Sequence, residues 1–131
     1  MRKATTLLMA LIFIFAAGAV ATAEDAAPQT FKGDYDWTDG DIGPLSATFT
    51  PDGENAWKVS FDFVWNGDEL TWKGTADGSL ADGTEVTGTA TDGNRNWVFE
   101  GSIKDGVMSG VHREIREGRD PYESGTFEIK R

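Results

Sequence analysis

Hydrophobic and polar residues alternate along most of the chain after residue 30. In the segment 56–65, for example, the apolar side chains occupy every second position: Trp57, Val59, Phe61, Phe63 and Trp65. Because successive side chains of an extended strand point to opposite faces, this period predicts a strand with one apolar face. The helical period of 3.6 residues does not occur between neighbouring turn signals, so the sequence predicts an all-β domain.

Turn dipeptides separate these segments. They are Asp39-Gly40, Asp52-Gly53, Asn66-Gly67, Asp77-Gly78, Asp82-Gly83, Asp92-Gly93 and Asp105-Gly106. Glycine adopts a positive φ without steric cost and Asp or Asn tolerates one, so such pairs are strong hairpin signals. We therefore predict eight strands, at 31–37, 44–50, 56–65, 70–76, 84–91, 96–103, 107–115 and 123–130.

Loop lengths predict how two of the hairpins pair. A three-residue loop at 51–53 sets Phe49 opposite Asn55, and a four-residue loop at 66–69 sets Trp65 opposite Leu70. Both pairings keep the apolar side chains on one face. After residue 23, every aromatic residue except Tyr122 falls on that inward face.

Glycines recur inside the predicted strands, at Gly74, Gly88, Gly101, Gly110 and Gly125. A glycine within a strand marks a bend or a close backbone approach, and a coiled sheet uses such positions to turn its corners. The alternative is that these glycines only make room beside bulky indoles.

Eight sequential antiparallel strands allow the last strand to pair with the first and leave no edge. The pattern thus favours an eight-stranded antiparallel up-and-down (meander) β-barrel, with an open meander or a sandwich as alternatives.

The first 23 residues have the features of a cleavable signal helix. Arg2 and Lys3 precede an apolar run over 7–17, and Ala21-Thr22-Ala23 forms a small-residue cleavage site. We expect residues 1–23 to be a signal peptide, 24–30 a flexible N-terminal segment and 31–131 a single barrel domain. Cleavage near Ala23 predicts a secreted or periplasmic protein.

The protein is acidic, which restricts its partners. Its 22 acidic and 12 basic residues give a formal charge of −10. Loss of the leader, which holds two cations and no acid, lowers this charge to −12. Such a surface repels nucleic acid and anionic lipid, and the polar outward positions argue against membrane insertion. The chain has no cysteine and shows no cofactor or metal motif, so we expect neither.

A short secreted chain that forms a glycine-punctuated, eight-strand meander with inward tryptophans resembles the calycin-type barrels, the avidin and lipocalin-like group. The Gly-x-Trp motif of the first lipocalin strand is absent, because Gly33 is followed by Asp34 and Tyr35 and the tryptophan comes later, at Trp37. No binding residue is therefore carried over from the family. The resemblance implies a ligand cavity at one open end.

Four tryptophans define the candidate site. The up-and-down path brings Trp37, Trp65, Trp72 and Trp97 close to one end of the barrel and leaves Trp57 at the other. An indole offers a flat apolar face and one N–H donor, so this mouth suits a sugar, a heteroaromatic ring or an acyl chain. Alternatively, these side chains fill the barrel, because an eight-strand interior is only just wide enough for one small ligand.

Tyr35 and His112 complete the candidate ligand-binding set, although the position of His112 depends on the register of strand 107–115. A two-residue turn at Asp105-Gly106 sets Phe99 opposite His112 and turns both His112 and Glu114 inward beneath the mouth. A bulged three-residue loop instead turns Val107 and Val111 inward. The glycine repeat favours the first register and the hydrophobic pattern favours the second, which is the one we expect because register follows the hydrophobic set.

These observations predict a small barrel that binds a partly apolar ligand at a tryptophan-lined mouth. The alternative is a structural or protein-interaction module with a filled core and no ligand. We do not expect an enzyme, because no base, nucleophile and orienting group can be assembled from the spacing.

Overall fold

The computed structural model describes residues 27–131. The predicted signal helix lies outside this range, as do the first three residues of the predicted flexible segment. Eight strands are present, in close agreement with the prediction: β2 (Gln29–Trp37), β3 (Ile42–Pro51), β4 (Ala56–Trp65), β5 (Asp68–Gly78), β6 (Glu85–Thr91), β7 (Asn96–Lys104), β8 (Val107–Ile115) and β9 (Tyr122–Lys130). The sequence prediction places Gln29 and Thr30 before the barrel, whereas they form the start of β2.

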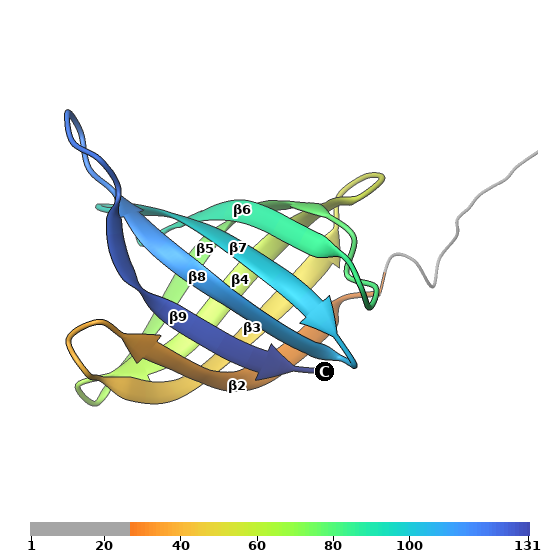
Figure 1. Cartoon of the computed structure of the whole chain (residues 1–131), viewed down its shortest axis with the longest axis horizontal. Helices are drawn as coiled ribbons and strands as arrows, with labels where there is room; N and C mark the ends of the chain where they lie inside the picture. The colour runs from red at the N-terminus through yellow and green to blue at the C-terminus, as the bar shows by residue number, and fades with distance from the viewer. Residues whose placement is uncertain (1–26) are drawn as a thin grey trace, which may run out of the picture.

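The strands form one closed barrel in meander order (Figure 1). Each strand pairs antiparallel with the next, and β9 pairs with β2, which closes the sheet. The open meander and the sandwich are therefore excluded. A closed sheet leaves every strand paired on both sides, so none is available for edge-to-edge association.

Two hairpins differ in register from the prediction. Phe49 pairs with Val59 rather than Asn55, and Trp65 pairs with Asp68 rather than Leu70. Asn66 and Gly67 both have positive φ, 53° and 82°, as a two-residue hairpin turn requires. Because both errors amount to an even number of residues, each apolar side chain stays on the predicted face.

The predicted register of β8 is wrong. Phe99 pairs with His112 and Gly101 pairs with Gly110, so His112 faces the interior and is only 7% exposed. Asp105 has a φ of 53° and forms a two-residue turn with Gly106, and this turn fixes the pairing. The part of the interior beside Gly110 is already occupied by an aromatic ring, because a Cβ on Gly110 would overlap the ring of Phe127. The outward positions of β8 consequently carry the valines that the hydrophobic pattern places inside.

The strand glycines lie where neighbouring backbones approach closely. A Cβ on Gly74 would overlap the carbonyl oxygen of Thr89, and a Cβ on Gly110 would overlap that of Glu100. These approaches support the interpretation that the glycines let the sheet coil into a barrel. The rings of Phe99 and Phe127 also lie over Gly88 and Gly110, so the glycines make room for aromatic side chains as well.

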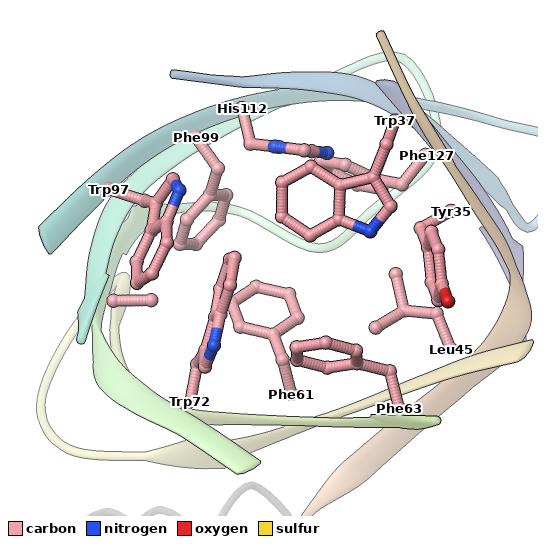
Figure 2. A pocket seen from close by; sticks show the side chains of 11 residues that line it. Tyr35, Trp37, Leu45, Phe61, Phe63, Trp72, Trp97, Phe99, His112 and Phe127 are labelled. Carbon is pink, nitrogen blue, oxygen red and sulfur yellow. The ribbon is translucent and has the colours of Figure 1, made fainter. Parts of the chain in front are cut away.

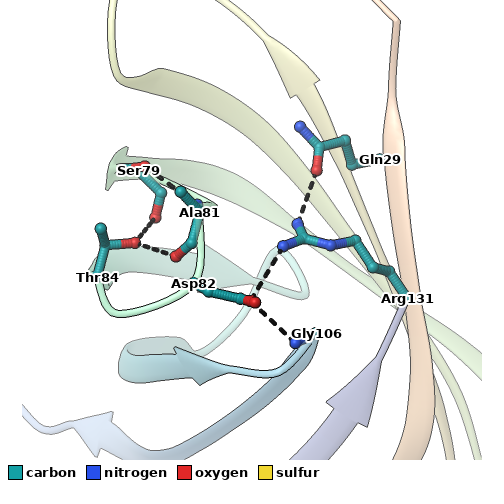
Figure 3. A network of polar contacts seen from close by, with 7 residues as sticks. All are labelled: Gln29, Ser79, Ala81, Asp82, Thr84, Gly106 and Arg131. Atoms are coloured by element: carbon teal, nitrogen blue, oxygen red, sulfur yellow. Dashed lines mark hydrogen bonds and ion pairs between the residues drawn. The ribbon is translucent and has the colours of Figure 1, made fainter.

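The loop between β5 and β6 shuts one end of the barrel. Leu80 from this loop is 3% exposed and belongs to the apolar core. The C-terminal Arg131 pairs with Asp82 at 3.6 Å and donates a hydrogen bond to Gln29, while the amide of Gly106 also donates to Asp82 (Figure 3). This network ties the loop, the β7–β8 turn and both ends of the described chain together, so access to the interior must come from the opposite end.

Candidate functional site

A hollow of about 240 Å³ lies at the opposite end of the barrel, and we call it the mouth hollow. Its lining is Trp37, Thr38, Asp39, Phe63, Trp65, Leu70, Trp72, Asp92, Arg95, Trp97, Glu114, Tyr122 and Ser124. All four tryptophans of the predicted mouth are among these residues. Trp57, by contrast, donates its indole N–H to the carbonyl of Gly78 near the shut end.

Three indoles, those of Trp37, Trp72 and Trp97, form the floor of the mouth hollow. Figure 2 shows these three rings pointing into the barrel interior. Trp72 and Trp97 are stacked, with ring centroids 3.6 Å apart and planes 14° apart. Trp37 meets Trp72 edge to face at 5.7 Å. Trp97 is 2% exposed. Offset stacks and edge-to-face pairs are the favoured arrangements of aromatic rings, so this floor is a packed part of the core.

A small apolar cavity of about 40 Å³ lies beneath this floor. Tyr35 and His112 line it, together with Leu45 and several aromatic rings (Figure 2). A water molecule needs roughly 10–15 Å³ of such space, so the cavity holds a few waters at most. The deep interior is therefore filled, and of the two spaces bounded by the tryptophans only the mouth hollow above has room for a ligand the size of a sugar ring.

The structure divides the predicted site residues into two groups. Trp37, Trp72 and Trp97 line both the hollow and the cavity, whereas Tyr35 and His112 line only the cavity. The Tyr35 hydroxyl donates to the carbonyl of Val64. Burial, together with the nearby carboxylates of Asp41 and Asp39, raises the pKa of that hydroxyl, so it stays protonated at neutral pH.

Trp65 lies on the rim of the mouth hollow. It is 37% exposed, and its indole N–H donates to the Asp41 carboxylate at 3.0 Å. Trp65 is thus held by the β2–β3 loop rather than by the packed floor, and it leaves part of an indole surface open to solvent.

A β-bulge at Ser124 shapes the wall between the cavity and the hollow. The β8–β9 pairing passes from His112↔Gly125 to Arg113↔Glu123 and skips Ser124. Such a bulge re-aims side chains, and here Ser124 and Gly125 are both buried. The same change of register turns Tyr122 toward the mouth, although the strict alternation predicts that it lies off the inward face.

Hydrogen bonds to Ser124 fix the tautomer of His112. The Ser124 hydroxyl donates to the backbone carbonyl of His112 at 3.0 Å, and its oxygen lies 2.7 Å from His112 Nδ1. Because a hydroxyl has one proton, Nδ1 must be the donor of the second bond. The neutral ring therefore carries its proton on Nδ1 and leaves a lone pair on Nε2.

Burial keeps His112 uncharged. Loss of hydration lowers the pKa of the imidazole from 6.5 to about 4, although the backbone of Thr126 acts in the opposite direction. At neutral pH the interior therefore contains a neutral imidazole that contacts Trp37, with ring centroids 4.9 Å apart.

Two indole N–H groups near the site lack a well-formed hydrogen bond, although the side chain of Trp37 acts on the Tyr35 hydroxyl and opposes the rise of its pKa. Within the described residues, the Nε1 atoms of Trp37 and Trp97 are buried and form no hydrogen bond. A buried donor without a partner is costly, and such groups in native proteins often have a water or ligand as partner. Both Nε1 atoms are enclosed by neighbouring side chains, so they belong to the packed interior beneath the mouth hollow.

Sequence reasoning missed most of the charged part of the mouth hollow, although the register of strand 107–115 that it did not choose turns Glu114 inward together with His112. Asp39, Asp92, Arg95 and Glu114 line the hollow, yet all lie in or beside segments that are otherwise typical of solvated turns. Asp92 accepts hydrogen bonds from the amides of Asn94 and Arg95, which hold its pKa below the usual range. The alternation of side chains along β8 was the signal that places Glu114 in the hollow. Residues two apart in a strand share a face, so an inward His112 requires an inward Glu114.

The remaining site chemistry is limited. Across residues 27–131 no three His, Asp or Glu side chains are grouped closely enough to hold a metal ion, and no helix is long and apolar enough to span a bilayer.

Comparison with known proteins adds no relative, since no protein-family model, curated protein or solved structure matches the chain.

Proposed function

We propose that this protein is a secreted or periplasmic barrel that binds a small, partly apolar ligand at the mouth hollow. One observation carries the proposal: the four mouth tryptophans line a single hollow, while a pinned loop shuts the other end of the barrel. Ligand sites are typically concave and largely apolar, with a few polar groups that fix orientation. The mouth hollow has this composition.

The unpartnered indole N–H groups support binding rather than simple filling. Trp97 is almost completely buried, yet its N–H lacks an acceptor among the described residues. If these side chains only filled the core, we would expect each buried N–H donor to have a hydrogen-bond acceptor or to be absent. Both donors are enclosed in this conformation, so a ligand oxygen would satisfy one of them only by shifting the ring of Trp37 or Trp97.

The fold supports the proposal by analogy. A closed eight-stranded meander barrel is compatible with a calycin-like fold, and we propose that kinship for this chain. Fold analogy alone does not assign a ligand, so the argument rests on the geometry of the mouth.

We propose binding rather than catalysis, although Ser124 and His112 resemble a nucleophile and its base. The Ser124 hydroxyl proton is directed to a backbone carbonyl, and Nδ1 of His112 is the donor rather than the acceptor. A catalytic base must accept the proton of its nucleophile. Both side chains are also buried, which favours a structural role for the pair.

Intrinsic fluorescence tests the proposal. A panel of metabolites, glycans and lipids is titrated into the protein, and we expect at least one to change the tryptophan emission with saturation. Trp65→Phe and Trp72→Phe should weaken that binding at least about tenfold. The control Trp57→Phe, near the shut end, should leave the affinity unchanged. A panel with no response, or equal effects of the mouth and control variants, would contradict the proposal.

One observation favours a second candidate, the interaction module with a filled core. The cavity below the floor is only about 40 Å³, so the lumen itself offers no ligand chamber. This candidate predicts that no small molecule raises the melting temperature, because only a ligand that binds the native state stabilises it.

A further inference from the structure

The mouth hollow is negatively charged. Its described lining contains the carboxylates of Asp39, Asp92 and Glu114 and a single guanidinium, that of Arg95. The whole chain adds to this field with its formal charge of −10. A cleft lined by one sign of charge concentrates ligands of the opposite sign.

Glu114 is the carboxylate best placed to contact a ligand. It lies at an inward position of β8 and pairs with Trp97 on β7 and Tyr122 on β9. The side chain is half-buried, and within the described residues its carboxylate takes part in no hydrogen bond or ion pair. A half-buried charge without a partner is unfavourable, so a cation beside Glu114 would supply the partner that this carboxylate lacks.

The aromatic faces of the mouth already attract cations. The Arg95 guanidinium lies over Trp97, 5.3 Å from the ring centroid, and Arg116 lies over Tyr122 at 4.4 Å. Tryptophan and tyrosine faces bind cations through the ring quadrupole. Arg95 is mostly exposed, and its contact with Asp92 at 3.8 Å is long, so a ligand cation could displace it from this place.

From these contacts we propose that the mouth hollow binds an organic cation, an amine or quaternary ammonium group attached to an apolar or aromatic body. The positive group lies between Glu114 and the aromatic faces of Trp97 and Tyr122, and it replaces the guanidinium of Arg95 over Trp97 and that of Arg116 over Tyr122. The apolar body rests on the indole floor. This inference rests on the proposed function and adds the ligand class to it.

Three probes that share a phenyl body separate the ligand classes. These are 2-phenylethylamine, 2-phenylethanol and phenylacetate, which are cationic, neutral and anionic at neutral pH. Each is titrated into the protein by calorimetry at low and at high salt. We expect the amine to bind at least about tenfold more tightly than the alcohol. Its advantage should shrink as salt screens the charges, and phenylacetate should bind most weakly.

Two mouth variants and one control variant assign the preference to the mouth. Glu114→Gln should reduce the ratio of amine to alcohol affinity to about two or less, whereas Glu128→Gln, the same charge change on the outer wall, should leave the ratio unchanged. Arg95→Gln should tighten amine binding several-fold because it removes the competing cation. The alcohol provides an internal control, since its binding reports whether each variant keeps an intact floor.

The outcomes separate this inference from the proposed function. If the alcohol or phenylacetate binds as tightly as the amine, the cation preference is wrong while a ligand-binding mouth stands. If Arg95→Gln weakens phenylacetate and leaves the amine unaffected, the hollow selects anions and the inference is overturned. If none of the three binds, the inference also fails, and the broader fluorescence panel then decides the proposed function.

Discussion

The clearest physical prediction concerns His112, which is the only histidine of the chain. In the folded protein burial lowers its pKa to about 4, whereas in the unfolded chain the pKa returns to the usual 6.5. The unfolded state therefore binds more protons between these values, and acid favours unfolding. The stabilising effect of a neutral His112 is fully present above about pH 6.5, is lost progressively as the pH falls, and levels off below about pH 4.

The size of this effect follows from the pKa difference. Each unit of pKa shift corresponds to about 1.4 kcal/mol, so the complete loss is roughly 3 kcal/mol. Between about pH 7.5 and pH 5 the free energy of unfolding should fall by roughly 2 kcal/mol. Asp92, whose pKa is lowered, contributes mainly below this range, because a carboxyl group in the unfolded chain titrates near pH 4.

Urea denaturation followed by tryptophan fluorescence, repeated at several pH values, measures this loss. His112→Gln provides the control, because glutamine does not titrate, and its free energy of unfolding should be nearly constant over the same pH range. The reasoning is refuted if the wild-type stability is flat from about pH 7.5 to pH 5, or if the glutamine variant keeps the same slope.

Three further substitutions test the packing around the barrel. Gly74→Ala should cost about 1–3 kcal/mol in urea denaturation, because its Cβ would overlap a carbonyl of the neighbouring strand; a cost no larger than that of the exposed Thr75→Ala would contradict the closure interpretation. Arg131→Ala should cost about 1 kcal/mol and lower the melting temperature by a few degrees, since it removes an ion pair and a cation–π contact at the shut end; an unchanged melting temperature would show that the network does not stabilise this end. Ser124→Ala should cost about 1–3 kcal/mol because it leaves Nδ1–H of His112 buried without its acceptor; a loss under about 0.5 kcal/mol would argue against the assigned tautomer.

The strand pattern could be predicted because side-chain alternation and Asp-Gly or Asn-Gly turns are local signals. All eight strands occur where the period of two and the turn pairs place them. The pairing errors at Phe49 and Trp65 did not affect the faces, since a shift by an even number of residues leaves the inward set unchanged.

The register of β8 shows where the hydrophobic pattern fails. Val107, Val111 and Ile115 form a more apolar set than His112 and Glu114, yet the latter pair faces inward. The two-residue turn at Asp105-Gly106 and the space taken by aromatic rings from other strands decide this register. Only the turn is visible in the local sequence, and the ring positions are a tertiary property.

The candidate site was predictable only in its aromatic part. The alternation of side chains along each strand predicts that the indoles point inward, and the up-and-down path places four of them at one end. The bulge at Ser124, which brings Tyr122 to the mouth, leaves no signal in the alternation. The unpaired carboxylate of Glu114 likewise becomes apparent only when the register and its neighbours Trp97 and Tyr122 are known.

The indole N–H signals in ¹H–¹⁵N NMR spectra test the central claim, ligand binding at the tryptophan-lined mouth, most directly. On titration with 2-phenylethylamine, and in parallel with 2-phenylethanol, the account predicts the largest shifts for Trp37 and Trp97, whose rings belong to the floor on which the phenyl body rests. The signal of Trp57, which is bonded to Gly78 near the shut end, should remain in place. Shifts of Trp57 as large as those of the mouth indoles, or no shift of any indole at saturating probe, would contradict the account.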